Sequence, residues 1–296
     1  MAATAAPAGN PAGAPAPYHR IRLQPISGSL GAIVHGVDLR QPLDAETYAE
    51  LKRAFLEQLV LFFRDQDITP DQQVAFGRNF GELHIHPFIP SLKDHKEIIV
   101  LKAKSGEEEN LRLANAWHED LSYTNDPPLA AILRSVNPPS RGGDTMWVNL
   151  YRAYETLSPK MQAIVEGLSA WHDVTHTYRR QELQMPGGPE RYAATFKKAP
   201  PVLHPLVQVH PETGRKLLYV SELTTTHIEG LKARESDALL QFLFRHIDWK
   251  ELHCRFYWEK NSIAMWDNRC TAHYAVGDYT EPREMHRVTV LGKVLN

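Results

Sequence analysis

The chain has 296 residues, of which 43% are hydrophobic and 23% are charged, and this ordinary composition excludes a wholly disordered, collagen-like or coiled-coil protein. The formal net charge of −2 gives no basic field that points to nucleic acid, and no apolar run approaches the roughly 18 residues that a membrane span needs. Two cysteines in so long a chain indicate a reducing compartment, so we expect a cytoplasmic protein without nucleic-acid or membrane partners.

The N-terminal segment, residues 1–17, is rich in alanine and proline and is predicted to be a disordered tail. It has neither the basic region nor the apolar region of a secretory signal. No linker-like stretch or internal repeat interrupts the rest of the chain. We therefore expect residues 18–296 to form one domain.

Helices are predicted where apolar side chains recur at spacings of three and four, or where capping residues precede such a pattern. Tyr48, Leu51 and Phe55 give the first helix one apolar face, and Thr69 followed by Pro70 is a typical helix start. The four predicted helices are Asp44–Gln58, Thr69–Phe80, Ser158–Gly167 and Glu235–Ile247.

Strands are predicted for short runs of β-branched, aromatic or apolar residues. These runs are Val60–Phe63, Ile98–Leu101, Leu129–Leu133, Arg255–Trp258, Ile263–Trp266 and Arg287–Leu291. Many strands with few helices between them argue against a doubly wound parallel sheet, and no glycine-rich nucleotide loop follows any strand. The pattern favours a mainly β fold, an antiparallel sandwich or barrel with flanking helices packed outside.

A candidate metal site is indicated by His118 and Asp120, which point to one face if they lie on a strand, since alternate strand residues share a face. His273 follows the predicted strand Ile263–Trp266 and is available as a third ligand. Two imidazoles and one carboxylate form the facial triad of non-haem Fe(II) oxygenases, which leaves positions open for a co-substrate and O₂. Zinc sites more often carry thiolates or three histidines.

Positive charge comes from Arg283 and Arg287, which share a face in an extended chain because an even number separates them. A guanidinium binds carboxylate, sulfonate or sulfate with a planar fork. Two buried arginines beside a metal would recognise two anions. Without the neighbouring motifs, a strand edge with solvated arginines would be the simpler interpretation.

Five ordered motifs resemble the taurine dioxygenase family of Fe(II)/2-oxoglutarate-dependent oxygenases. They are FGELHIHP within 76–87, WHEDLSY at 117–123, GGDT at 142–145, WDNRCTAHYAVGDY at 266–279 and REMHRVTVLG at 283–292. The resemblance runs from about residue 21 to the C-terminus. It implies a double-stranded β-helix, or jelly roll, which agrees with the antiparallel sandwich expected from the strand runs.

The resemblance also implies roles for single residues. Fe(II) would be held by His118, Asp120 and His273, and the distal carboxylate of 2-oxoglutarate by Thr145 and Arg283, with O₂ as the second co-substrate. His86 and Arg287 match the pair that holds a sulfonate, and Tyr178 stands at a substrate position where the family residue is Phe-like. Relatives of this kind are often dimers or tetramers, so we expect a homo-oligomer.

Three pocket positions depart from the family pattern. Glu119 stands where Thr or Ser is usual, and Ile89 and Thr224 stand where aromatic residues are expected. Because His86 and Arg287 remain, we expect a small anionic organic substrate, first of all taurine or a related alkanesulfonate, with hydroxylation beside the head group and release of sulfite. Alternatives are an alkyl sulfate ester, an aryloxyalkanoate, a divalent-metal hydrolase using the same three ligands, and an inactive binding protein on this scaffold.

Overall fold

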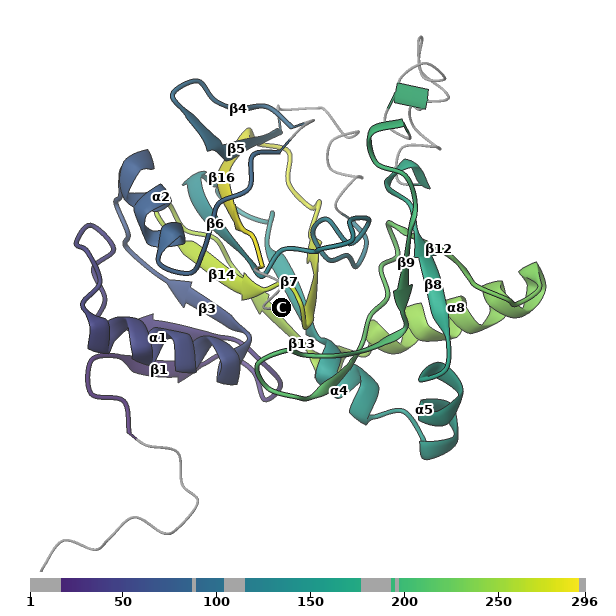
Figure 1. The fold of residues 1–296 in the computed structure, drawn as a ribbon. Coiled ribbons are helices and arrows are strands. Elements are labelled where there is room, and N and C mark those ends of the chain that lie inside the picture. The colour runs from purple at the N-terminus through teal and green to yellow at the C-terminus, as the bar shows by residue number, and fades with distance from the viewer. Residues whose placement is uncertain (1–16, 87–88, 104–114, 177–192, 195–196, 293–296) are drawn as a thin grey trace, which may run out of the picture.

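The structure is a computed structural model that describes residues 17–86, 89–103, 115–176, 193–194 and 197–292 (Figure 1). Nearly all of the tail expected to be disordered, residues 1–16, lies outside the described part. No helix in the described ranges is long and apolar enough to cross a membrane.

The secondary structure is dominated by strands. The helices are α1 (Ala45–Gln58), α2 (Pro70–Arg78), α4 (Leu150–Glu155), α5 (Pro159–Val165) and α8 (Ala233–Ile247), with a 3-10 turn at Lys250–Leu252. The strands are β1 (Arg22–Pro25), β2 (Ala32–His35), β3 (Val60–Phe63), β4 (Ser91–Leu92), β5 (His95–Ala103), β6 (Ala130–Asn137), β7 (Thr145–Asn149), β8 (Ser169–His172), β9 (Val202–Pro205), β10 (Val207–Val209), β11 (Lys216–Leu218), β12 (Thr225–Ile228), β13 (His253–Phe256), β14 (Ile263–Asp267), β15 (Thr271–Ala275) and β16 (Arg283–Val290).

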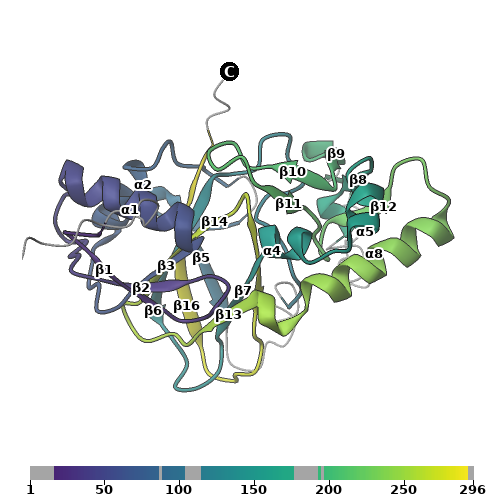
Figure 2. The ribbon, with the colours of Figure 1, turned by 90° about the horizontal axis from the view of Figure 1, so that it is seen from below.

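The larger sheet has eight strands in the order β1-β2-β3-β14-β6-β16-β5-β4, and its pairs are antiparallel except β2 with β3. Helices α1 and α2 pack on this sheet, at the opposite side of the molecule from α4, α5 and α8 (Figure 2). Alternate residues of β3 face its two sides. Leu61 and Phe63 lie in the core under the helices, while Val60 and Phe62 lie in a second core behind the sheet, so the whole run is apolar.

The second core lies between the larger sheet and a three-stranded sheet with the order β13-β7-β15. The ring of Phe62 stacks on Phe256 of β13 at 4.1 Å between centroids and meets Trp147 of β7 edge-on at 5.3 Å. Two antiparallel sheets packed over one core form the expected jelly roll. The short sheets β12-β8-β9 and β10-β11 extend it on the side of α8 (Figure 2).

All four predicted helices are present, with ends shifted by a few residues. The caps explain the starts: Asp44, Thr69 and Ser158 each accept a backbone N–H from the first turn, and Thr69 forms a capping box with Gln72. Each predicted strand overlaps an observed one, although β13 begins and ends two residues before the predicted run. The sequence did not predict β1, β2, β4, β7, β15, α4 or the strands β8–β12, which are short or mixed in polarity.

Candidate active site

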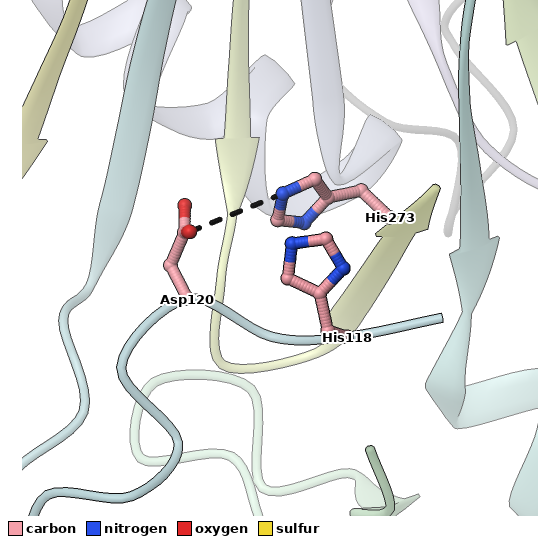
Figure 3. A group of neighbouring side chains, drawn as sticks. All are labelled: His118, Asp120 and His273. Carbon is pink, nitrogen blue, oxygen red and sulfur yellow. Dashed lines mark ion pairs between the residues drawn. The ribbon is translucent and has the colours of Figure 1, made fainter. Parts of the chain in front are cut away.

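The three candidate ligands meet at one point between the sheets (Figure 3). Their ligating atoms all lie within 4.8 Å of one another, and His273 Nε2 is 4.0 Å from Asp120 Oδ1. His273 is in β15, whereas His118 forms only an isolated bridge to His273, with backbone N···O distances of 3.1 and 2.8 Å. The expectation that His118 and Asp120 lie on a strand is therefore wrong, because the chain turns at Asp120 and Leu121 adopts φ +56°.

The protonation of these groups suits a cation. The Nδ1 atom of His118 lies 2.8 Å from the Ala116 carbonyl, which assigns the proton to Nδ1 and leaves Nε2 with its lone pair. Burial lowers the pKa of both His118 and His273, so each imidazole is neutral. Burial alone would raise the pKa of Asp120, but the charge of Arg287 and its hydrogen bond to the carboxylate act in the opposite direction, and that pKa lies below its usual value.

Asp120 has one oxygen engaged and one available. Its Oδ1 accepts a hydrogen bond from Arg287 Nη1 at 2.5 Å in a buried ion pair, while Oδ2 is buried without a partner among the described residues. Buried carboxylate oxygens are rarely left unpaired. An unpartnered carboxylate oxygen beside two neutral imidazoles is a donor set that fits Fe(II).

A second cluster of possible ligands, His210, Asp267 and Cys270, is already neutralised by a cation from the chain itself. Arg269 Nη2 lies 2.6 Å from Asp267 Oδ2, and His210 Nε2 lies 3.1 Å from the same oxygen. His210 had no partner that the sequence could suggest. This cluster is a buried hydrogen-bond network rather than a second metal site.

Thr145 stands at the start of β7, and Asp144 separates it from the two glycines of the GGDT motif. Gly142 and Gly143 have φ of +73° and +69°, and a Cβ at Gly142 would lie 2.6 Å from Asp278 Oδ1, so the tight turn requires glycine there. The Thr145 hydroxyl is 3.0 Å from Trp258 Nε1. Because an indole N–H can only donate, Thr145 Oγ1 accepts this bond and its own proton is available for another acceptor.

Arg283 reaches the same region from β16 in the facing sheet. Its Nη2 lies 3.4 Å from the Gly143 carbonyl, its guanidinium lies 5.8 Å from the ring centre of Tyr279, and its Nε is buried without a partner among the described residues. Thr145 and Arg283 both line one cavity with the three candidate ligands. A hydroxyl donor and a guanidinium in the lining of one cavity are suited to a carboxylate.

That cavity has a volume of about 500 Å³ and also contains the second predicted anion pair, His86 and Arg287. Burial and the charge of Arg287 lower the pKa of His86 to about 4, so its imidazole is neutral. Its Nδ1 accepts the Ile89 N–H at 3.1 Å, which assigns the proton to Nε2 and makes that atom a donor. Tyr178, predicted to contact substrate, lies outside the described residues.

The three positions that depart from the family pattern all line the cavity. Ile89 and Thr224 belong to its wall, where apolar residues predominate: Pro90, Val100, Leu101, Leu121, Val174 and Leu223. Glu119 is only 2% exposed, and its carboxyl oxygens have no partner among the described residues. Burial raises the pKa of Glu119 well above its usual value, which favours the uncharged form.

Sequence reasoning missed two residues that support the site. Trp258 was assigned only to a strand, and Asn268 was not among the predicted site residues. Asn268 Oδ1 accepts the Asp120 N–H at 2.8 Å, and its Nδ2 donates to the Asp120 carbonyl at 2.9 Å. Neither residue type carries a sequence signal for such a role, because both contacts join distant parts of the chain.

Comparisons with known proteins show which family this chain is similar to. The family model described as "Taurine catabolism dioxygenase TauD, TfdA family" matches residues 22–289. An α-ketoglutarate-dependent sulfate ester dioxygenase of Pseudomonas putida is 35% identical over 96% of this chain and 94% of its own length. An α-ketoglutarate-dependent 2,4-dichlorophenoxyacetate dioxygenase of Cupriavidus pinatubonensis is 32% identical over 90% of this chain and 96% of its own length.

A solved structure extends the likeness to three dimensions. The crystal structure of a taurine dioxygenase from Burkholderia xenovorans superimposes with a TM-score of 0.79, at 39% sequence identity, over 93% of this chain and 91% of that chain. The likeness thus covers most of the length of both chains.

Proposed function

Because the chain belongs to the taurine catabolism dioxygenase TauD, TfdA family and is therefore an Fe(II)- and 2-oxoglutarate-dependent dioxygenase, we propose that His118, Asp120 and His273 hold its iron. The observation that carries this assignment is the convergence of the three ligating atoms within 4.8 Å, with Asp120 Oδ2 buried and unpartnered among the described residues. When bound, the iron supplies the activation of O₂ and the oxidative decarboxylation of 2-oxoglutarate that drive hydroxylation.

The protein's own residues position the two organic molecules. Thr145 and Arg283 bind the distal carboxylate of 2-oxoglutarate, the first through a hydroxyl proton that Trp258 leaves available and the second through its guanidinium. His86 Nε2 and Arg287 bind the anionic head group of the primary substrate in the same cavity. Fixing the head group selects which carbon faces the metal, and small errors in such placement cost large factors in rate.

The substrate that the cavity fits best is an alkyl chain with a sulfonate or sulfate ester head group. The two carboxyl groups in its described lining are Glu119, whose burial favours the uncharged form, and Asp120, which is paired with Arg287. Neither offers a free negative charge to the ammonium group of taurine. The apolar wall of Ile89, Val100 and Leu223 instead suits a hydrocarbon chain.

The head group and the reaction are tested together with substrates of matched chain length. The purified protein, loaded with Fe(II) and 2-oxoglutarate, is given hexyl sulfate, hexanesulfonate, hexanoate, a phenoxyacetate or taurine. Succinate, sulfate and sulfite are measured separately. We expect O₂-dependent succinate with one equivalent of sulfate or sulfite from the first two compounds, and weaker turnover of taurine.

The outcomes separate the remaining alternatives. Turnover of the carboxylates alone would overturn the assignment to sulfur head groups and favour an aryloxyalkanoate. Sulfate released without O₂ or 2-oxoglutarate would indicate a metal hydrolase. The matched control is Asp120→Ala, which should release no succinate above background, because a ligand has been removed while Arg283 and Arg287 are retained.

We propose in addition that the protein works as a homo-oligomer, as the resemblance implies. Sedimentation at several protein concentrations measures the assembly directly. A monomer at all concentrations would contradict this part of the proposal.

A further inference from the structure

The placement of Asp120 is not explained by the sheets. His118 is held by its bridge to His273, but after that single bridge the chain leaves any ladder and turns, so strand pairing does not fix the backbone of Asp120. A ligand on such a turn needs some other restraint, since metal geometry tolerates only small errors in side-chain position.

The side chain of Asn268 supplies that restraint. Its Oδ1 accepts the backbone N–H of Asp120 at 2.8 Å, and its Nδ2 donates to the backbone carbonyl of Asp120 at 2.9 Å. The backbone N–H and the backbone carbonyl of Asp120 are thus both held by the rigid side-chain amide of Asn268, across a sequence separation of 148 residues. A longer contact of Nδ2 with the Pro128 carbonyl, at 3.4 Å, completes the set.

Asn268 is itself firmly anchored. It is fully buried, and its backbone N–H donates to the Leu129 carbonyl at 3.0 Å. It lies in the turn between β14 and β15, the strand that carries His273. One amide therefore joins the backbone of one candidate ligand to the turn that delivers another.

The turn does not depend on this amide for its own shape. Asp267 accepts the Arg269 N–H through Oδ1 at 3.0 Å, and the Asp267 carbonyl accepts the Thr271 hydroxyl at 2.7 Å. The bonds of Asp267 therefore close the turn. The bonds of Asn268 leave the turn and go to Asp120 and Pro128.

We propose that Asn268 is a positioning residue for the metal: it fixes the backbone of Asp120 so that Oδ2 faces the two imidazoles while Oδ1 stays with Arg287. The inference rests on the proposed assignment of Asp120 as a ligand. Removing residues that orient metal ligands weakens metal binding by about 10- to 100-fold. Asn268→Ala is expected to do the same, although Asn268 does not touch the metal.

The test is anaerobic titration of the purified full chain with Co(II) alone, followed by the absorption spectrum of the bound ion. The matched control is Asn149→Ala, because Asn149 is also a buried asparagine with two amide bonds, to the Ser29 carbonyl and from the Arg152 N–H, and contacts none of the candidate ligands. We expect Co(II) affinity to fall by about 10- to 100-fold in Asn268→Ala, with a changed spectrum at saturation, and by less than about twofold in Asn149→Ala.

A second variant, Asn268→Ser, keeps a polar group that is too short to hold both backbone groups, and it should also bind Co(II) more weakly. Wild-type affinity and spectrum in either Asn268 variant would overturn the proposal, as would an equal loss in Asn149→Ala. Failure of both Asn268 variants to fold would also overturn it, because the amide would then be a determinant of folding. Asp120→Ala separates a failure of the proposed iron site from a failure of the role proposed for Asn268. If Asp120→Ala binds Co(II) like the wild type, the proposed iron site is wrong. If it loses Co(II) binding while the Asn268 variants do not, only the inference about Asn268 fails.

Discussion

The bond from Trp258 to Thr145 can be removed without touching the cavity. Trp258→Phe deletes the indole N–H that Thr145 Oγ1 accepts at 3.0 Å, and the Thr145 hydroxyl is then able to turn away from the proposed site of the 2-oxoglutarate carboxylate. A hydrogen bond to a charged group contributes about 1.5–3 kcal/mol, of which a freely rotating donor loses only part. We therefore expect the dissociation constant of 2-oxoglutarate to rise by about 3- to 10-fold.

The stability of the variant must be separated from this effect. Trp258 is 1% exposed and packs edge-on against Phe256, so its truncation to Phe should cost about 1–3 kcal/mol of unfolding free energy. Trp147→Phe is the matched control, because Trp147 is also fully buried but its indole N–H has no partner among the described residues. It should lose comparable stability and keep the affinity for 2-oxoglutarate.

The assay is anaerobic titration of 2-oxoglutarate into the metal-loaded protein, with Thr145→Val as the reference for complete loss of the hydroxyl. An unchanged affinity in Trp258→Phe, together with a loss in Thr145→Val, would refute the argument that the indole orients the hydroxyl. An unchanged affinity in Thr145→Val would refute the role of Thr145 itself.

Two further predictions follow from the charges in the buried site and core. Arg287→Ala should weaken binding of the anionic primary substrate by about 10- to 100-fold. At saturating metal it should change 2-oxoglutarate affinity by less than about threefold, because Arg287 is paired with Asp120 and proposed to bind the head group, whereas Thr145 and Arg283 are proposed to hold the 2-oxoglutarate carboxylate. Separate titrations measure both affinities, and a larger loss for 2-oxoglutarate would reverse the assignment. Burial lowers the pKa of His172 to about 3, below the value of about 6.5 in an unfolded chain, so stability should fall as pH drops from about 6.5 toward 3, by about 2 kcal/mol at pH 5. Urea unfolding at pH 8 and pH 5 measures the unfolding free energy at each pH. The difference between these two free energies should be smaller in His172→Phe than in the wild type by about that amount. An equal difference in both proteins would contradict the assignment.

Local sequence signals were sufficient to predict the helices and strands that have a strong sequence pattern. Helix α2 was predictable because Thr69 and Gln72 form a capping box and Pro70 is the first helical residue. Strand β3 was predictable because both of its faces are buried in apolar cores, so all of its residues are apolar. Strands such as β1, with the sequence RLQP, carry no such pattern, since their stability comes from pairing with a neighbour rather than from their own residues.

The sequence predicted which residues form the site, but it did not predict the backbone conformation and the tertiary contacts that hold them in place. His118, Asp120, His273 and Arg283 belong to motifs that the family resemblance makes visible, and the structure brings them to one cavity. The local conformation of Asp120 was predicted wrongly, because a single bridge and a turn replace the expected strand. The pairing of Arg287 with Asp120, across 167 residues, is a tertiary contact that no local pattern encodes.

The central claim is that one metal ion lies between His118, Asp120 and His273. Crystals of the protein grown with Mn(II) and N-oxalylglycine, a non-reacting analogue of 2-oxoglutarate, would locate the metal by its anomalous scattering. The account predicts one strong peak at bonding distance from all three side chains, with the analogue's distal carboxylate at Thr145 and Arg283. A peak among other residues, such as His210, Asp267 and Cys270, or no peak between the three ligands, would contradict it.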